Sequence, residues 1–270
     1  MLGRLMKYEF KSTYREFLGI YCALIISTLL TWMVDLPQLE VVGYIASICV
    51  FAVIVAAIVI MLMSILGAFN KRVYGREGYL NMTLPATVHQ QVLARLFVSV
   101  IWCLITIIVM ILSFLLLLQI HGGIFTQEIL LPQVMDLLKA LWENNVILTI
   151  ILLIGCGLAS IFGMVLSLYS ASAVAHLPFC RRWKVLAGIG TLFVFAIVES
   201  RILWLIAYAS TGWIEDIGQR FSNGVPTEMV PEYVGYINLA IGVFLLLAVI
   251  FAVAKYFLTT YLLSRHMELE

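Results

Sequence analysis

The chain has 270 residues, of which 63% are hydrophobic and 11% are charged, and its formal net charge at pH 7 is +1. Soluble domains average about 45–50% apolar and about 25% charged residues, so this composition excludes an ordinary soluble domain and predicts an integral membrane protein. The net charge says little about partners, and we expect the lipid membrane but no nucleic acid among them.

Residues 1–16 have a pattern typical of a basic amphipathic helix. Four basic residues fall within an arc of about 80° on a helix: Arg4, Lys7, Lys11 and Arg15. The opposite side is apolar and holds Leu2, Met6, Phe10 and Phe17, with Glu9 at its flank. Such a helix lies on the inner leaflet of a membrane, so we expect an interfacial elbow helix over 1–16. The alternative is a basic flank without a helix.

Six apolar segments follow, each long enough to cross a bilayer. A spanning helix needs about 20 apolar residues to cross about 30 Å of hydrocarbon. The segments are 17–34, 41–69, 96–118, 146–177, 185–209 and 236–261. Backbone groups in lipid must be hydrogen-bonded within the chain, which favours helices over an open sheet. The predicted fold class is an all-α integral membrane protein with six transmembrane helices, forming a single transmembrane domain over 1–270.

The distribution of basic residues predicts the orientation of these spans. If both termini lie inside, the inner flanks hold twelve basic residues: Arg4, Lys7, Lys11, Arg15, Lys71, Arg72, Arg76, Arg95, Arg181, Arg182, Lys184 and Arg265. The outer loops then hold only Lys139 and Arg220. Because cytoplasmic loops carry an excess of Lys and Arg, we expect a multi-pass protein of the plasma membrane with both termini cytoplasmic.

The first inner loop, 70–92, is polar and is interrupted by glycines. Gly75 and Gly78 break any long helix, and Thr87 with Gln90 predicts a capping box for the helix that enters the third span. The loop also has an apolar ridge with a charged rim, a composition that suits a docking surface for a soluble partner. The ridge consists of Tyr74, Tyr79, Leu80 and Met82. The alternative is a solvated linker.

The fourth span has a continuous stripe of small residues, which allows another helix to approach closely. The stripe recurs every four residues: Gly155, Ala159, Gly163, Ser167, Ala171 and Ala175. Two interpretations stay open. The stripe either packs inside the protein, or it forms a subunit contact or the lining of a pathway.

The fifth span contains two charges, Glu199 and Arg201, within FAIVESRILWL. Charges at this depth are costly and usually face protein or water. A separation of two residues places the two side chains about 200° apart on a helix, so they do not pair with each other. They either line a substrate path or outer gate, or each finds a structural partner on a neighbouring helix. Lys255, near the inner end of the last span, is expected to snorkel to the interface.

No pattern in the chain supports catalysis. The four histidines are scattered, the five cysteines form no CxxC pair, and HExxH, GxSxG and GxxxxGK[ST] motifs are absent from the sequence. We therefore expect no enzyme activity, no catalytic or metal-binding residue and no cofactor held by this chain.

Two stretches resemble the membrane permease subunits of bacterial type-2 ATP-binding-cassette (ABC) exporters. YGREGYLNMTLPATVHQQVLARL is similar to the first inner loop of these permeases, and MLGRLMKYEFKSTYREF is similar to their N-terminal elbow helix. The resemblance implies an exporter in which two permeases, identical or paralogous, pair and bind a dimer of separate ABC ATPase subunits that hold ATP and Mg. It implies an ATPase-coupling role for Tyr74, Arg76, Glu77, Gly78, Tyr79 and Leu80. A second inner contact would lie at 176–184.

An apolar core with few charges favours an antimicrobial peptide or a lipid-like amphiphile as the exported cargo. The alternative function is a membrane-embedded scaffold or sensor, which would bind a cytoplasmic regulatory protein through the same loop without transport.

Overall fold

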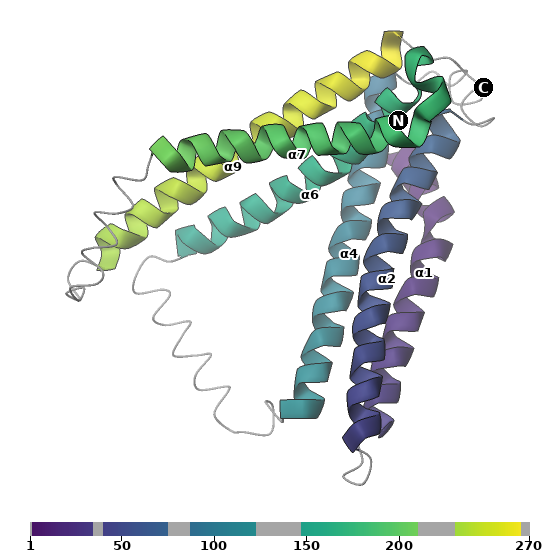
Figure 1. The fold of residues 1–270 in the computed structure, drawn as a ribbon, viewed down its shortest axis with the longest axis vertical. Helices are drawn as coiled ribbons and strands as arrows, with labels where there is room; N and C mark the ends of the chain where they lie inside the picture. The colour runs from purple at the N-terminus through teal and green to yellow at the C-terminus, as the bar shows by residue number, and fades with distance from the viewer. Residues whose placement is uncertain (1, 35–39, 75–86, 123–146, 210–229, 266–270) are drawn as a thin grey trace. The chain divides into compact units, whose positions relative to one another are not determined.

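The computed structural model describes residues 2–34, 40–74, 87–122, 147–209 and 230–265 (Figure 1). These residues form seven helices, with no strand among them: α1 (Leu2–Val34), α2 (Glu40–Val73), α4 (Val88–Gly122), α6 (Ile147–Ala175), the 3₁₀ helix η2 (Pro178–Trp183), α7 (Lys184–Ala209) and α9 (Val230–Arg265). The prediction of an all-helical protein is confirmed for this part of the chain.

Five of these helices are long and apolar enough to cross a membrane. The qualifying segments are Ile48–Lys71, Val88–Leu116, Ile147–Ala175, Lys184–Ile206 and Val234–Ser264. Helix α1 contains a shorter apolar stretch, Phe17–Leu29. The described residues thus have the helices of a membrane-spanning protein, whereas the sixth span and the orientation of the termini stay predictions.

The helix boundary expected near residue 16 is absent, because α1 runs without a break through 33 residues. No proline interrupts it, and the Thr13 hydroxyl donates a hydrogen bond to the Glu9 carbonyl at 3.0 Å, within the helix itself. The apolar side of the segment contacts another helix, since Phe10 and Phe17 pack on Trp102 of α4. The predicted amphipathic pattern is present, but part of its apolar side is covered by protein.

The chain forms two compact units, residues 1–133 with 268–270 and residues 134–267. In the first unit, α1 packs against both α2 and α4, and in the second, α6 packs against both α7 and α9. The two units therefore share an arrangement in which the first long helix contacts both of the other long helices. The prediction of a single domain over 1–270 stays a prediction.

Trp102 is the centre of the contact between α1 and α4. Its ring stacks between Phe10 and Phe17, with centroids 4.5 Å away on each side and interplanar angles of 10° and 4°. Its Nε1–H donates a hydrogen bond of 2.9 Å to the Thr13 hydroxyl, so the polar edge of the indole is satisfied although the side chain is buried. A buried Trp N–H usually has a hydrogen-bond partner, and Thr13 provides it here.

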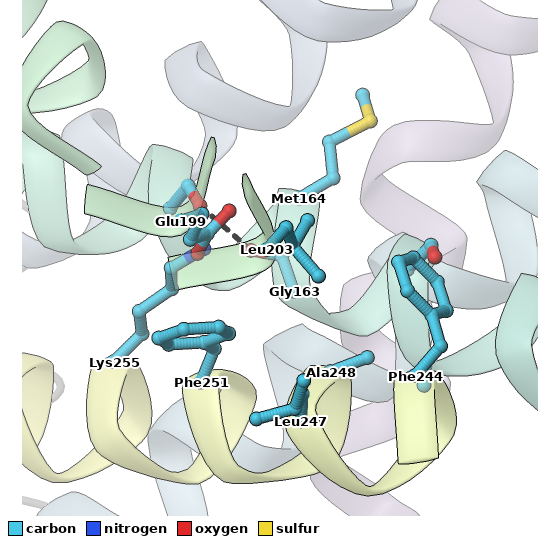
Figure 2. A pocket seen from close by; sticks show the side chains of 12 residues that line it. Gly163, Met164, Glu199, Leu203, Phe244, Leu247, Ala248, Phe251 and Lys255 are labelled. Atoms are coloured by element: carbon cyan, nitrogen blue, oxygen red, sulfur yellow. Dashed lines mark hydrogen bonds and ion pairs between the residues drawn. The ribbon is translucent and has the colours of Figure 1, made fainter. Parts of the chain in front are cut away.

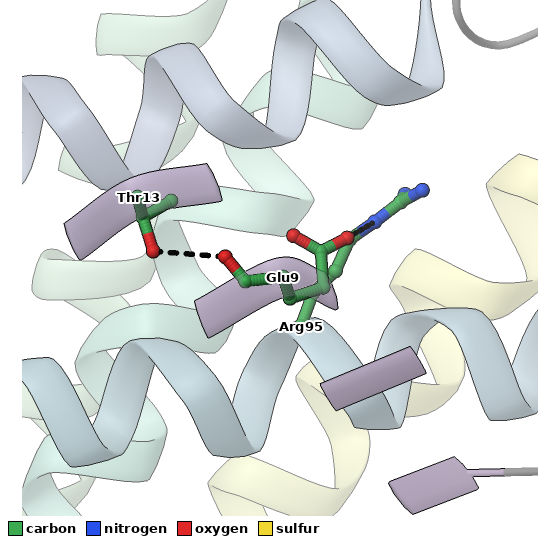
Figure 3. A network of polar contacts seen from close by, with 3 residues as sticks. All are labelled: Glu9, Thr13 and Arg95. Atoms are coloured by element: carbon green, nitrogen blue, oxygen red, sulfur yellow. Dashed lines mark hydrogen bonds and ion pairs between the residues drawn. The ribbon is translucent and has the colours of Figure 1, made fainter. Parts of the chain in front are cut away.

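Polar contacts on both sides of Trp102 show that α1 and α4 run parallel. Arg95 Nε donates to Glu9 Oε1 at 3.2 Å on the N-terminal side (Figure 3). On the C-terminal side, the hydroxyls of Tyr21 and Thr106 lie 2.9 Å apart. Residues later in α1 therefore contact residues later in α4, as in any pair of parallel helices.

Helices α6 and α9 also run parallel. The Thr149 hydroxyl donates to Asn238 Oδ1 at 2.6 Å, and the Cys156 thiol donates to the Ile241 carbonyl at 3.6 Å. Compared with the Thr149–Asn238 pair, the contact between Gly155 and Leu245 lies further along both helices. In each unit, then, the first long helix is parallel to the third long helix.

Replacing Trp102 tests the importance of this contact. We expect Trp102→Ala to lower the free energy of unfolding by about 3–5 kcal/mol, because it empties the space between two rings. Trp102→Phe keeps a ring and loses only the hydrogen bond to Thr13, so about 1 kcal/mol is expected. SDS titration of the purified protein in mixed micelles measures both values. Ile101→Ala is the control, since Ile101 is 38% exposed, and an equal loss for Ile101→Ala and Trp102→Ala would contradict the assignment.

Candidate functional site

A cavity of about 220 Å³ lies in the second unit, among α6, α7 and α9 (Figure 2). Each helix contributes residues of one face, spaced three or four apart, as the helical period requires. From α9 these are Phe244, Leu247, Ala248, Phe251 and Lys255; from α7, Glu199 and Leu203; from α6, Ala159, Ser160, Gly163, Met164 and Ser167. The wall is mostly apolar, and its charged groups are one carboxylate and one ammonium.

The carboxylate and the ammonium form an ion pair between Glu199 Oε1 and Lys255 Nζ. Figure 2 shows Phe251 and Lys255 on the same side of α9, with Lys255 extending toward Glu199 of α7. The Lys255 side chain is only 7% exposed, whereas that of Glu199 is 32% exposed. The Lys255 ammonium also lies 5.6 Å from the centre of the Phe195 ring, close enough for a cation–π contact.

This pair is held in surroundings where a single charge would be very unfavourable. Removing one partner of a buried ion pair leaves an uncompensated charge, which typically costs about 3–5 kcal/mol. Membrane-spanning segments tolerate ionisable residues chiefly where they pair with each other or face a cavity. Glu199 and Lys255 meet both conditions.

Glu199 therefore satisfies both interpretations that the sequence left open. It has a structural partner on a neighbouring helix, and it also lines a cavity. Arg201 is not part of the cavity wall and lies on an exposed side of α7. The structure thus separates two residues that the sequence analysis had grouped together.

Lys255 is the residue that sequence analysis missed. The expectation that it snorkels to the interface is wrong, because its side chain is buried and ion-paired within the second unit. One signal in the sequence pointed toward this site: Lys255 follows Phe244, Leu247 and Phe251 on a single helical face.

The small-residue stripe of α6 has three parts with different roles. At one end, a Cβ on Gly155 would contact Leu245 of α9 at 3.4 Å. In the middle, Ala159, Gly163 and Ser167 line the cavity. At the other end, Ala171 and Ala175 face Gly188 of α7, where an added Cβ would lie 3.6 Å from the Ala175 Cβ. The two ends of the stripe therefore pack against neighbouring helices, and its middle lines the cavity.

Gly163 differs from the other glycines of these contacts because the space before it is open. A Cβ built there would have no neighbour within 4 Å. The absence of a side chain at this position therefore contributes to the volume of the cavity, and helix packing does not require it.

The predicted capping box of the helix entering the third span is confirmed in part: Thr87 caps α4, and the return bond from the Gln90 side chain stays a prediction. The Gln90 N–H donates to the Thr87 hydroxyl at 3.4 Å, and the Gln91 N–H donates to the Thr87 carbonyl at 3.1 Å. The bond to the hydroxyl satisfies a donor that the start of α4 would otherwise leave free, and the bond to the carbonyl is the first bond of the helix itself.

Tyr74 is the one predicted coupling residue that the structure describes. It is 7% exposed, packs edge-on against Phe69 and donates its backbone N–H to Asn70 at 2.9 Å. Burial raises the pKa of the Tyr74 hydroxyl, which stays neutral. Arg76, Glu77, Gly78, Tyr79 and Leu80 lie outside the described residues, so the coupling role of this set stays a prediction.

The second predicted inner contact, 176–184, is formed largely by η2. Two aromatic side chains are exposed here, Phe179 at 98% and Trp183 at 62%, beside the exposed Arg182. Exposed aromatic residues with a basic rim are typical of a partner-binding surface or of a membrane-interface anchor.

Comparison of the chain with protein-family models, curated proteins and solved structures found no match. Within the described residues, no three His, Cys, Asp or Glu side chains gather in a way that could hold a metal ion. The fold and the site therefore define a class only: a helical protein with membrane-length apolar helices and an ion pair on the wall of a cavity.

The ion pair predicts unequal costs for its two single replacements. Glu199→Gln should lower the free energy of unfolding by about 3 kcal/mol, because the nearly inaccessible Lys255 ammonium loses its counter-charge. Lys255→Met should cost less, since Glu199 is more exposed. The double variant Glu199→Gln with Lys255→Met should lie within about 1 kcal/mol of the original protein. SDS titration measures the series with Arg201→Gln as the control, and additive losses in the double variant would contradict the pairing.

The glycines of the second unit provide a matched test of packing. Gly188→Ile should lower the free energy of unfolding by about 1–3 kcal/mol relative to Gly163→Ile, because a Cβ at Gly188 would already contact α6 and the atoms beyond it would be crowded, whereas the space before Gly163 is open. Thermal unfolding in detergent compares the two variants, which gain the same side chain in a helix interior. Equal Tm values would show that α6 and α7 do not meet at Gly188.

Proposed function

We propose that the chain is the permease subunit of an ATP-driven ABC exporter of the type-2 class. The observation that carries the proposal is the Glu199–Lys255 ion pair on the wall of a cavity formed by three membrane-length helices. Ionisable groups inside such helices most often mark a substrate or ion pathway. The similarity of the 74–96 stretch and the N-terminal stretch to these permeases supports the same assignment.

In this proposal the permease does no bond chemistry, and the partner ATPases bind ATP and Mg. Their movement enters through the first inner loop, at Tyr74, Arg76, Glu77, Gly78, Tyr79 and Leu80, with a second contact at Phe179 and Trp183. The free energy comes from contacts that the ATPase makes differently in its two states. A second permease, identical or paralogous, completes the cargo path.

The first unit is suited to transmit such movement. The loop ends at the Thr87 cap of α4, and two turns later Arg95 pairs with Glu9 of α1. Glu9 and Arg95 are largely buried, with side-chain exposures of 14% and 8%. This ion pair and the stacked Trp102 hold α1 against the N-terminal half of α4. A displacement of the loop would therefore move both helices together.

A second candidate is a membrane-embedded scaffold or sensor. The exposed Phe179 and Trp183 favour partner binding in general, and a regulatory protein would fit them as well as an ATPase. The two candidates differ in the partner that is bound and in whether any cargo moves.

Native mass spectrometry of the complex extracted from membranes tests the proposal. We expect two permease chains with two ATPase chains. Glu77→Ala and Tyr79→Ala should reduce ATPase recovery by tenfold or more, since truncating an interface anchor typically costs about 2 kcal/mol or more. Lys139→Ala, in a predicted outer loop, is the control. Recovery of the chain with a regulatory protein and no ATPase would support the scaffold instead.

A further inference from the structure

We propose that the cavity of the second unit binds the head group of an ammonium-bearing amphiphile, with Glu199 as its acceptor. Its role as the cargo site rests on the proposed function, whereas ammonium binding itself can be measured without transport. The inference depends on the unequal exposure of the two charges and on the apolar wall beside them.

The accessible charge of the cavity is negative. Glu199 is 32% exposed and Lys255 only 7%. Glu199 Oε1 has essentially no accessible surface and faces the ammonium of Lys255. A carboxylate has two oxygens with about four lone-pair sites, so Oε2 offers acceptor capacity to a ligand while the internal pair stays intact.

An anionic ligand has no comparable position. It would have to reach the Lys255 ammonium, whose side chain is only 7% exposed and which already contacts Glu199 and the Phe195 ring. A carboxylate or phosphate would also meet the exposed part of Glu199 first, and like charges repel at such short range. The arrangement of the two charges therefore selects cations over anions, although their sum is zero.

The rest of the wall is suited to an apolar chain. Phe244, Leu247, Phe251 and Met164 line it, and Gly163 leaves open space before it. The Phe rings also offer π faces to a cation. A cavity of about 220 Å³ is smaller than the roughly 300–1,000 Å³ that encloses a drug-sized ligand. It therefore accommodates a head group and the first part of a chain, and the remainder of the amphiphile extends along the apolar helices.

Photo-labelling of the full chain in lipid nanodiscs tests the proposal. The probe is an alkylammonium with a diazirine near its amine, and mass spectrometry locates the labelled residues. We expect labelling at Met164 and Phe251. Dodecylammonium should block it at about a tenfold lower concentration than dodecanol or dodecyl phosphate, since a hydrogen bond to a charged group contributes about 1.5–3 kcal/mol. Equal blocking by dodecanol would overturn the inference.

A charge exchange gives the sharpest variant. Glu199→Lys combined with Lys255→Glu keeps an ion pair but makes the exposed member cationic, so dodecyl phosphate should become the better competitor. Glu199→Gln with Lys255→Met removes both charges and should abolish the preference, which decides the matter if the exchanged protein does not fold. Ser200→Ala, exposed on the same helix and outside the cavity wall, should keep the ammonium preference. An ammonium preference that survives both double variants would overturn the inference.

The proposed function fails separately from this site. If ammonium labelling is found but vesicles containing the purified complex show no ATP-dependent movement of any amphiphile, the exporter assignment fails and the binding site stands. If ATP-dependent transport occurs with no preference for ammonium head groups in labelling, the exporter stands and this inference fails.

Discussion

The pairing of Glu199 with Lys255 is the constraint on which the second unit depends. Neither charge is stable alone among apolar helices, so each determines where the other helix can lie. Helix α6 packs against both α7 and α9, and the ion pair links these two helices beside the small residues in the middle of its stripe. The cavity is the space that these small residues leave next to the pair.

The first unit also places polar and charged groups between apolar helices, but in a different arrangement. Polar groups between α1 and α4 are paired with each other: Glu9 forms an ion pair with Arg95, and the indole N–H of Trp102 donates a hydrogen bond to Thr13. Phe10 and Phe17 stack on both sides of Trp102, whose side chain is buried. In the first unit these polar groups are paired within a helix contact, whereas in the second unit one charged group stays partly exposed at a cavity.

Much of the local structure could be predicted from sequence. Long apolar runs predicted helices of membrane length, and Thr87 with Gln90 predicted the cap of α4. Residues 1–16 were correctly expected to be helical with an apolar side, but their separation from the following span was wrong. The amphipathic pattern shows that a face is apolar, and it does not distinguish a lipid surface from the face of α4.

The sequence by itself determined the helices, their apolar lengths and the positions of the intramembrane charges, because these depend on neighbours within a few turns. Only the tertiary structure decided which residues meet. Trp102 and Thr13 are 89 positions apart, and Glu199 finds Lys255 on a different helix. Such partners depend on which helical faces pack together, and in a uniformly apolar chain many faces are chemically equivalent. The sequence alone therefore predicted an interfacial position for Lys255, whereas in the folded chain the Glu199 carboxylate of α7 lies beside it.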